Sequence, residues 1–294
     1  MKKISILICG IFLTINTYAQ RSELGVMVGT SYYLGDINPN NQFGSPNFAA
    51  GIVYRYNLNP HWALKFNALY GSLDARDSDY GNIRNLSFRT DILEFSAQIE
   101  LNFWEYFTGS KTRRFSPYIF TGIAAFNFNP QAMDSAGVWH DLQPLGTEGQ
   151  GTIIYPTRKV YSLTQLAIPF GIGFKYSVSK SICIGVEWGM RKTFTDYIDD
   201  ISTTYVDRTL LSNEKGPFAG YLSDRTPELT YLADPNDPTS LTRRPPNEVD
   251  KQRGNSSNED WYSFAGFTIT FKLGYKSRPS CFDKGFNYKE NIYY

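Results

Sequence analysis

The sequence predicts an all-β protein, an eight-stranded antiparallel transmembrane β-barrel with short periplasmic turns and long external loops. Three observations lead to this fold class. Apolar residues alternate with small or polar ones at a period of two, which is the spacing of side chains along a β-strand. The apolar side of this pattern is rich in aromatic residues, and the opposite side combines glycines with charges. The segments between the alternating stretches are short and long in turn.

The clearest alternation is a hairpin of residues 165–177 and 181–191, joined by a tight turn. Its apolar side consists of Leu166, Ile168, Phe170, Ile172, Phe174, Tyr176, Ile182, Ile184, Val186, Trp188 and Met190. Its other side carries glycines beside Lys175, Glu187 and Arg191. In a soluble sandwich that second side would put unpaired charges in a poorly packed core. The pattern therefore favours the inverse arrangement, in which the apolar side faces lipid and the polar side lines a narrow lumen.

The same alternation recurs along the chain and gives eight strands. The predicted strands are residues 24–34, 48–58, 62–70, 93–103, 117–128, 165–177, 181–191 and 261–275. The fifth strand is the least clear, because it is apolar on both sides. Aromatic residues make up 16% of the chain, in keeping with strands that face a membrane interface.

The connections between these strands alternate in length, with the basic connection at 104–116 of medium length. The segments 73–85, 129–161 and 195–260 are predicted to be loops, whereas the turns near residues 57–61 and 179–180 are short. Bacterial outer-membrane barrels have short periplasmic turns and long external loops. With an even number of strands, both mature termini are then expected in the periplasm.

The N-terminus has the features of a signal peptide. Lys2 and Lys3 precede a short apolar stretch, and a small-x-small cleavage site ends at Ala19. The sequence thus divides into a signal peptide at 1–19, a barrel at 20–275 and a periplasmic tail at 276–294. Past the N-terminus, no apolar run approaches the roughly 18 residues of a membrane-spanning helix. We expect an exported protein of the Gram-negative outer membrane, embedded in its lipid.

Eight charged residues fall on the lumen side of the predicted strands. They are Arg55, Lys65, Glu94, Glu100, Lys175, Glu187, Arg191 and Lys272. An eight-stranded barrel is just wide enough inside for side chains, and buried charges need partners. We expect a paired, hydrated charge network; the alternative is a selective channel.

The sequence offers little for catalysis or cofactor binding. His61 and His140 fall on opposite sides of the membrane in this topology, so a Ser-His-Asp set is not predicted. No metal-binding or phosphate-cradling motif is present, and a net charge of +1 gives no electrostatic case for nucleic acid. We expect no catalytic residue, cofactor, metal or small-molecule substrate. Asp196, Asp199 and Asp200 are expected to be solvated loop carboxylates; alternatively, they collect a cation or a basic segment.

Two segments are candidate docking surfaces for a periplasmic partner. The first is the basic connection with Lys111, Arg113 and Arg114; the second is the aromatic and basic tail, with Phe282 and Phe286. The alternatives are solvated charge and a disordered tail.

Two cysteines remain after the signal peptide, Cys183 and Cys281. Both are expected near the same rim of the barrel, and Cys281 lies within the candidate docking tail. An oxidising compartment permits a disulfide between them, or an intermolecular bond to a partner. They could equally be two unrelated thiols.

Several runs of sequence resemble one family. These are YYLGD at 32–36, YRYNL at 54–58, LQPLGTEGQG at 142–151, QLAIPFG at 165–171 and RKTFTDYIDD at 191–200. On these runs the chain resembles PorG, the small outer-membrane barrel of the type IX (Por) secretion system of the Bacteroidetes. The resemblance extends from about residue 22 to about residue 275, and the runs at 142–151 and 191–200 are its most specific parts.

The resemblance implies a non-enzymatic, structural component of a protein secretion machine. Its partners would be a periplasmic ring lipoprotein and that lipoprotein's partner subunit, and in some species the machine supports gliding motility. The expected role is to anchor or stabilise the ring at the outer membrane. Two alternatives remain at this point: a lipid-modifying barrel enzyme, which would have to use His140, and a small passive pore.

Overall fold

The computed structural model describes residues 21–233 and 239–273 of the chain. The predicted signal peptide at 1–19 and the predicted tail at 276–294 lie outside the described residues. Cys281, Phe282 and Phe286, which belong to the proposed docking tail, lie outside them as well.

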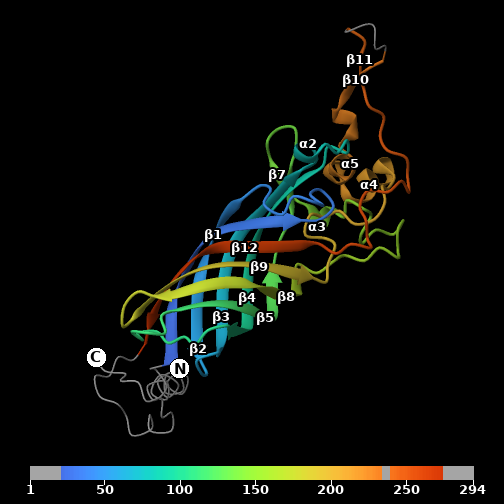
Figure 1. Ribbon diagram of the computed structural model, residues 1–294. Helices are drawn as coiled ribbons and strands as arrows, with labels where there is room; N and C mark the ends of the chain where they lie inside the picture. The colour runs from blue at the N-terminus through green and yellow to red at the C-terminus, as the bar shows by residue number, and fades with distance from the viewer. Residues whose placement is uncertain (1–20, 234–238, 274–294) are drawn as a thin grey trace.

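Eight long antiparallel strands close into a barrel (Figure 1). They are β1 (Ser22–Leu34), β2 (Asn47–Asn57), β3 (Trp62–Arg76), β4 (Ser87–Asn102), β5 (Phe115–Asn127), β8 (Thr164–Ser177), β9 (Ile182–Thr193) and β12 (Trp261–Lys272). Each strand pairs with its neighbours, and β1 closes the barrel by pairing with β12. The predicted fold class is therefore confirmed. β1 begins and β12 ends at the same rim, which we call the terminal rim; the opposite end is the cap end.

The barrel is apolar outside and polar inside over most of its length. The outward side chains exposed on the strands include Leu24, Val26, Val28, Ile52, Phe66, Phe95, Ile99, Ile123, Leu166, Ile172, Phe174, Ile184, Val186, Phe267, Ile269 and Phe271. The residues between them point into the lumen and are buried. A continuous apolar exterior on a closed barrel matches the hydrocarbon core of a membrane.

Strands β3 and β4 extend beyond this apolar belt, and there the pattern reverses. Above Tyr70 the outward residues of β3 are Ser72, Asp74 and Arg76, whereas Leu73 and Ala75 are buried inside. The prediction that strand three ends at residue 70 and that residues 73–85 form a loop was wrong. In this extension a polar exterior surrounds an apolar interior, which is the arrangement expected of strands in water.

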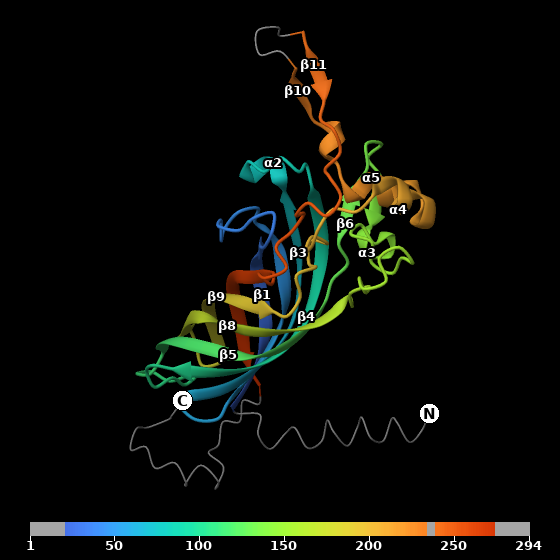
Figure 2. The same cartoon turned by 90° about the vertical axis from the view of Figure 1, so that its right-hand side faces the viewer.

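The cap end carries an ordered cap built from the long connections (Figure 2). It contains α2 (Asp77–Tyr80), β6 (Gln131–Met133), β7 (Trp139–Asp141), α3 (Leu142–Leu145), α4 (Arg208–Lys215), α5 (Pro217–Ser223), the short 3₁₀ helix η3 (Thr226–Glu228) and the hairpin β10 (Thr230–Leu232) and β11 (Leu241–Arg243). Both figures show that the hairpin is the part of the cap farthest from the barrel. The segments predicted as plain loops at 129–161 and 195–260 thus hold short helices and strands. Within the described residues, no helix has the length and apolar character needed to cross a membrane.

Candidate functional site

The lumen of the barrel contains a network of buried ion pairs centred on Glu100. This carboxylate accepts from Arg55 Nε at 2.9 Å and from Lys175 Nζ at 2.9 Å, and Lys65 Nζ lies 3.4 Å away. Glu100 and its three partners are each at most 1% exposed. Three cations around one carboxylate require further anions close by.

Two further carboxylates complete this part of the network. Glu23 accepts from Arg55 Nη1 at 3.0 Å, and Glu187 accepts from Lys65 Nζ at 2.5 Å and from the Tyr118 hydroxyl at 2.7 Å. Glu23 was absent from the predicted set because it precedes the first residue assigned to strand one. Its place in the period-two alternation of β1, one residue before the outward Leu24, could have identified it as lumen-facing.

A separate pair lies nearer the cap end. Arg191 donates to Glu94 through Nε at 2.9 Å, and the Tyr262 hydroxyl donates to the same carboxylate at 3.0 Å. The buried lumen charges then comprise four cations (Arg55, Lys65, Lys175 and Arg191) and four carboxylates (Glu23, Glu94, Glu100 and Glu187). The network is balanced in charge, so its members satisfy one another.

Aromatic rings fill the space between these charges. Lys65 Nζ lies 4.1 Å from the centroid of the Phe120 ring, and Lys175 Nζ lies 4.9 Å from that of Tyr118. A side chain at Gly173 would collide with the Tyr118 ring, and one at Gly189 would collide with Phe120. The glycines on the lumen side therefore make room for the rings. Strand five is apolar on both sides because its inward residues belong to this packing.

The connection between β4 and β5 folds back into the terminal mouth of the barrel. Tyr106 is fully buried, and its backbone N–H donates to Pro60 O at 3.1 Å. The Thr108 hydroxyl donates to Glu23, and Gly109 N donates to Ser177 Oγ at 2.8 Å. This segment plugs the lumen from the terminal side, while Phe126, Phe128, Tyr262 and Phe264 belong to the buried core toward the cap. The lumen is sealed at both ends.

The structure places seven of the eight predicted lumen charges in buried ion pairs, five of them in the network around Glu100 and two in the separate pair of Arg191 and Glu94. Lys272 is the exception: it lies half-buried at the terminal rim, where Nζ is 3.4 Å from Thr108 O. Cys183 is buried on the lumen side near the same rim. A bond between Cys183 and Cys281 stays a prediction, because Cys281 lies outside the described residues.

The predicted basic connection lies on the outer surface of the plug. Lys111 is exposed, whereas Arg113 and Arg114 are half-buried. Arg113 pairs with Glu105 at 2.6 Å, and Arg114 Nε donates to Ser110 O at 3.0 Å. The plug thus holds the two arginines in place and presents Lys111 beyond the rim.

A second set of charges lies where the cap meets the barrel; Asp36 and Arg84 are half-buried and the other members are buried. This junction cluster consists of Asp36, Glu148, Asp196, Asp199, Asp200 and Asp260 with Arg84 and Arg253. Arg253 joins three cap segments, donating to Glu148 Oε1 at 2.9 Å, to Asp200 O at 2.6 Å and to Ser223 O at 3.0 Å. Arg84 donates to Arg253 O at 2.6 Å.

The aspartates of the cluster are held by hydroxyls and backbone N–H groups. Tyr33 donates to Asp199 Oδ2 at 2.5 Å, and Tyr161 donates to Asp200 Oδ1 at 2.7 Å. The backbone N–H of Ile198 donates to Asp260 Oδ2 at 2.8 Å. The expectation that Asp196, Asp199 and Asp200 are solvated was wrong: they are 8%, 1% and 0% exposed. The cap covers them, and an aperiodic segment gives no sequence signal for that.

Burial in the junction favours the protonated form of these aspartates. It raises the pKa of Asp196 to about 9, to which the charges of Asp199 and Asp36 contribute. Burial also raises the pKa of Asp200 to about 6, against the opposing effect of Arg253. The pKa of Asp260 lies well above its usual range because of burial and the nearby Asp199. Asp196 accepts no hydrogen bond of normal geometry, although Ser202 lies close enough to offset part of the effect of burial.

The two histidines lie at opposite ends of the barrel. His61 Nδ1 is 3.0 Å from Asn102 O at the terminal rim. His140 lies in the cap, where Nε2 is 2.8 Å from Asp134 Oδ2 and the ring stacks on Phe218 at 4.3 Å. In the described part of the chain, no three His, Cys, Asp or Glu side chains are arranged to hold a metal ion.

Fold and site together define the class of the protein. It is a membrane-spanning β-barrel of the outer-membrane type, with a sealed, charge-paired lumen and a structured cap. Residues 2–143 and 150–210 match the model of a family described as a domain of unknown function, DUF6089. The chain belongs to that family.

Comparisons with solved structures return small barrels at low similarity. Ail of Yersinia pestis, in complex with the heparin analogue sucrose octasulfate, is 7% identical with a TM-score of 0.38, over 85% of this chain and 96% of Ail. Neisserial surface protein A is 9% identical with a TM-score of 0.39, over 86% and 97%. OprG of Pseudomonas aeruginosa is 12% identical with a TM-score of 0.37, over 86% and 98%. Similarity this low carries no functional argument. No curated protein sequence matches the chain.

Proposed function

We propose that the protein is a structural outer-membrane component of the type IX secretion machinery, of the PorG type, which anchors or stabilises a periplasmic ring complex. The observation that carries the proposal is the convergence of three runs on which the family resemblance rests. Tyr33 from the first run donates to Asp199 in the last, and Thr147 from the loop run donates to Asp200. These three runs are far apart in the sequence but form one buried junction. We expect this of runs that share a role in one particular fold.

A sealed lumen supports a scaffold more than a conduit. The interior is occupied by ion pairs at most 4% exposed, by aromatic rings and by the plug. Opening a path would leave several charges without partners, which costs several kcal/mol for each broken pair. The protein then acts through its two ends, and its barrel holds those ends at fixed positions in the membrane.

In this proposal the terminal rim faces the periplasm and the cap faces outward. Two of the three connections at the terminal rim are short turns and the third forms the plug, whereas the cap is built from the long connections, as in bacterial outer-membrane barrels. The ring lipoprotein and its partner subunit would contact the plug surface at Lys111, Arg113 and Arg114, together with the tail. The plug suits this role because its base is fixed inside the barrel by Tyr106 and Thr108.

Crosslinking in outer membranes tests the proposal. The tagged protein is purified after mild crosslinking, with and without reductant, and the co-purifying proteins are identified by mass. We expect the ring lipoprotein and its partner subunit, with recovery reduced by Lys111→Glu and unchanged by Lys192→Glu at the cap end. Purification of the protein alone, under conditions that preserve large assemblies, would refute the proposal. If the partners no longer co-purify when reductant is present, a disulfide to a cysteine of this protein holds them.

A further inference from the structure

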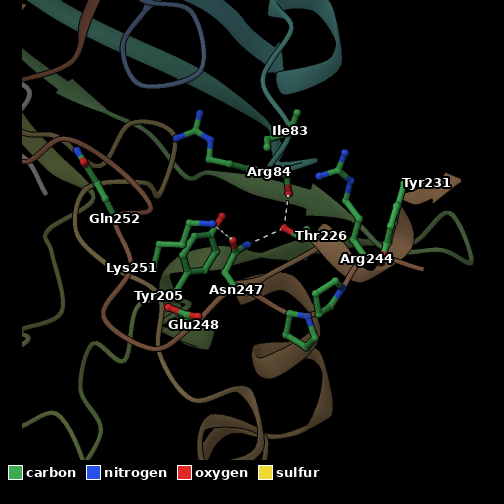
Figure 3. A pocket seen from close by; sticks show the side chains of 12 residues that line it. Ile83, Arg84, Tyr205, Thr226, Tyr231, Arg244, Asn247, Glu248, Lys251 and Gln252 are labelled. Carbon is green, nitrogen blue, oxygen red and sulfur yellow. Dashed lines mark hydrogen bonds between the residues drawn. The ribbon is translucent and has the colours of Figure 1, made fainter. Parts of the chain in front are cut away.

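A cavity of about 550 Å³ lies in the cap at the base of the β10–β11 hairpin, a size in the usual range of ligand pockets (Figure 3). Its lining comes from four parts of the chain: the α2–β4 connection, the segment before α4, the η3–β10 segment and the stretch after β11. The lining residues on which the argument depends are Ile83, Tyr205, Tyr231, Arg244, Glu248 and Lys251.

The hairpin turns one of its two faces to this cavity. Arg244 N donates to Leu229 O, and Ala233 N donates to Ser240 O. Alternation along an antiparallel pair then places Leu229, Tyr231 and Arg244 on one face. Tyr231 and Arg244 both line the cavity, whereas Arg243 is exposed on the opposite face.

The cavity is lined by donors, Tyr205, Arg244 and Lys251, and by one carboxylate, Glu248. Tyr205 is 2% exposed, and its hydroxyl is buried without a hydrogen-bond partner among the described residues. Burial raises the pKa of Tyr205 to about 12, so the hydroxyl keeps its proton. The Arg244 guanidinium lies 5.8 Å from the centroid of the Tyr231 ring, and Lys251 Nζ donates to Asn247 Oδ1 at 2.8 Å. The unmatched Tyr205 hydroxyl and the two cations line one cavity, and their donors outnumber its single carboxylate, which favours an anionic acceptor as the ligand.

The apolar part of the lining is mainly aliphatic. Ile83 is 62% exposed at the cavity, and Pro245 and Pro246 are exposed beside it. Sugars are commonly held on open aromatic faces, but of the two rings here Tyr205 is buried and Tyr231 has Arg244 over its face. A cavity that offers this aliphatic surface together with Arg244 and Lys251 suits a peptide that carries an acidic residue beside an apolar one.

We propose that this cavity binds an acidic polypeptide segment, whose carboxylate is received by Arg244, Lys251 and the Tyr205 hydroxyl while a neighbouring apolar side chain packs against Ile83 and the two prolines. The cap is therefore a recognition surface for a protein ligand, in addition to closing the barrel. This inference does not depend on the secretion role, because it rests only on residues of the cap.

A peptide library tests the inference on the full-length protein in detergent micelles. The probe is a positional-scanning library of acetylated, amidated hexapeptides, followed by fluorescence polarisation with the selected peptide and with its Asp-to-Asn or Glu-to-Gln analogue. We expect selection of an acidic residue next to Val, Leu or Ile, and at least about tenfold weaker binding of the neutral analogue. No acidic preference, or no binding at millimolar peptide, would overturn the inference.

Matched variants locate the binding. Arg244→Gln and Tyr205→Phe are each expected to weaken binding about tenfold, and Glu248→Gln to strengthen it slightly by removing a like charge. Arg243→Gln changes the same residue type one position away, on the other face of the hairpin, and is expected to leave affinity unchanged. Equal losses for Arg243→Gln and Arg244→Gln would overturn the proposed site. If no peptide binds but an oligogalacturonate does, with the same losses for Arg244→Gln and Tyr205→Phe, the peptide proposal would be overturned in favour of an acidic glycan as the ligand.

Discussion

The lumen and the junction cluster both bury many charges, but they stabilise them in different ways. In the lumen four cations face four carboxylates, and Glu100 alone has three cationic neighbours. In the junction six carboxylates lie near two guanidinium groups: Arg253 pairs with Glu148, whereas Arg84 pairs with a seventh carboxylate, that of Asp77. The lumen satisfies its charges by pairing; the junction satisfies its carboxyl groups by protonation and by donors such as Tyr33 and Tyr161. The barrel should therefore tolerate changes of pH that loosen the cap.

The largest effect is expected from breaking the lumen network at its centre. Glu100→Gln leaves Arg55, Lys65 and Lys175 around a neutral amide and should lower the free energy of unfolding of the barrel by ~3–5 kcal/mol. Urea unfolding in lipid vesicles measures this loss. Glu259→Gln, at the exposed pair with Lys192, is the matched control and should cost ~0–1 kcal/mol. Similar losses for the two variants would show that the lumen pairs are no more important than surface ones.

Breaking the junction should affect the cap and spare the barrel. Arg253→Met removes the partner of Glu148 and the link to Asp200 O, so the cap should be destabilised by ~3–5 kcal/mol. Hydrogen exchange resolved by region should show faster exchange in residues 195–233 and 239–260 and unchanged exchange in β1 to β5. Arg243→Met, on the exposed hairpin, serves as the control. Faster exchange in the barrel strands would mean that the two regions are not independent.

The pH response should separate the two regions. Folding raises the pKa of Asp196 from 3.8 to about 9, so the folded cap holds that proton more tightly than the unfolded chain. The stability that the cap gains from holding this proton is complete below pH 3.8. It is lost as pH rises to about 9, at ~1.4 kcal/mol per pH unit. The cap should open more often as pH rises from 6 to 9. Hydrogen exchange, corrected for its intrinsic pH dependence, measures this opening. Asp196→Asn should reduce that slope, leaving the contribution of Asp260, and an unchanged slope would refute the assignment.

The smallest effect is expected from removing one hydrogen bond of the lumen. Tyr118→Phe deletes the donor to Glu187 and keeps the ring that packs near Lys175. Because Lys65 still pairs with Glu187, the barrel should lose only about 1.5 kcal/mol in the same urea assay. A loss as large as that of Glu100→Gln would show that aromatic donors, rather than ion pairs, stabilise the lumen.

The membrane-embedded part of this fold could be predicted because one rule governs it. Lipid outside and a narrow lumen inside impose a period of two, and that period correctly placed Arg55, Lys65 and Glu94 on the inside. The rule fails where lipid ends. Above Tyr70 the strands are polar outside, so Asp74 and Arg76 looked like loop residues.

The junction cluster could not be predicted for a different reason. Asp196, Asp199 and Asp200 lie in an irregular segment, and only the packing of distant residues such as Tyr33 and Arg253 buries them. The sequence runs that resemble PorG marked these positions without showing their environment.

Single-channel recording in planar lipid bilayers tests the central claim, a sealed barrel that acts as a scaffold, most directly. The purified full-length protein is reconstituted at neutral pH and at pH 9, where the cap is expected to loosen. We predict no conductance steps at either pH, since the plug and the lumen ion pairs do not depend on the cap. Reproducible steps from the wild-type protein would contradict the account and favour a pore.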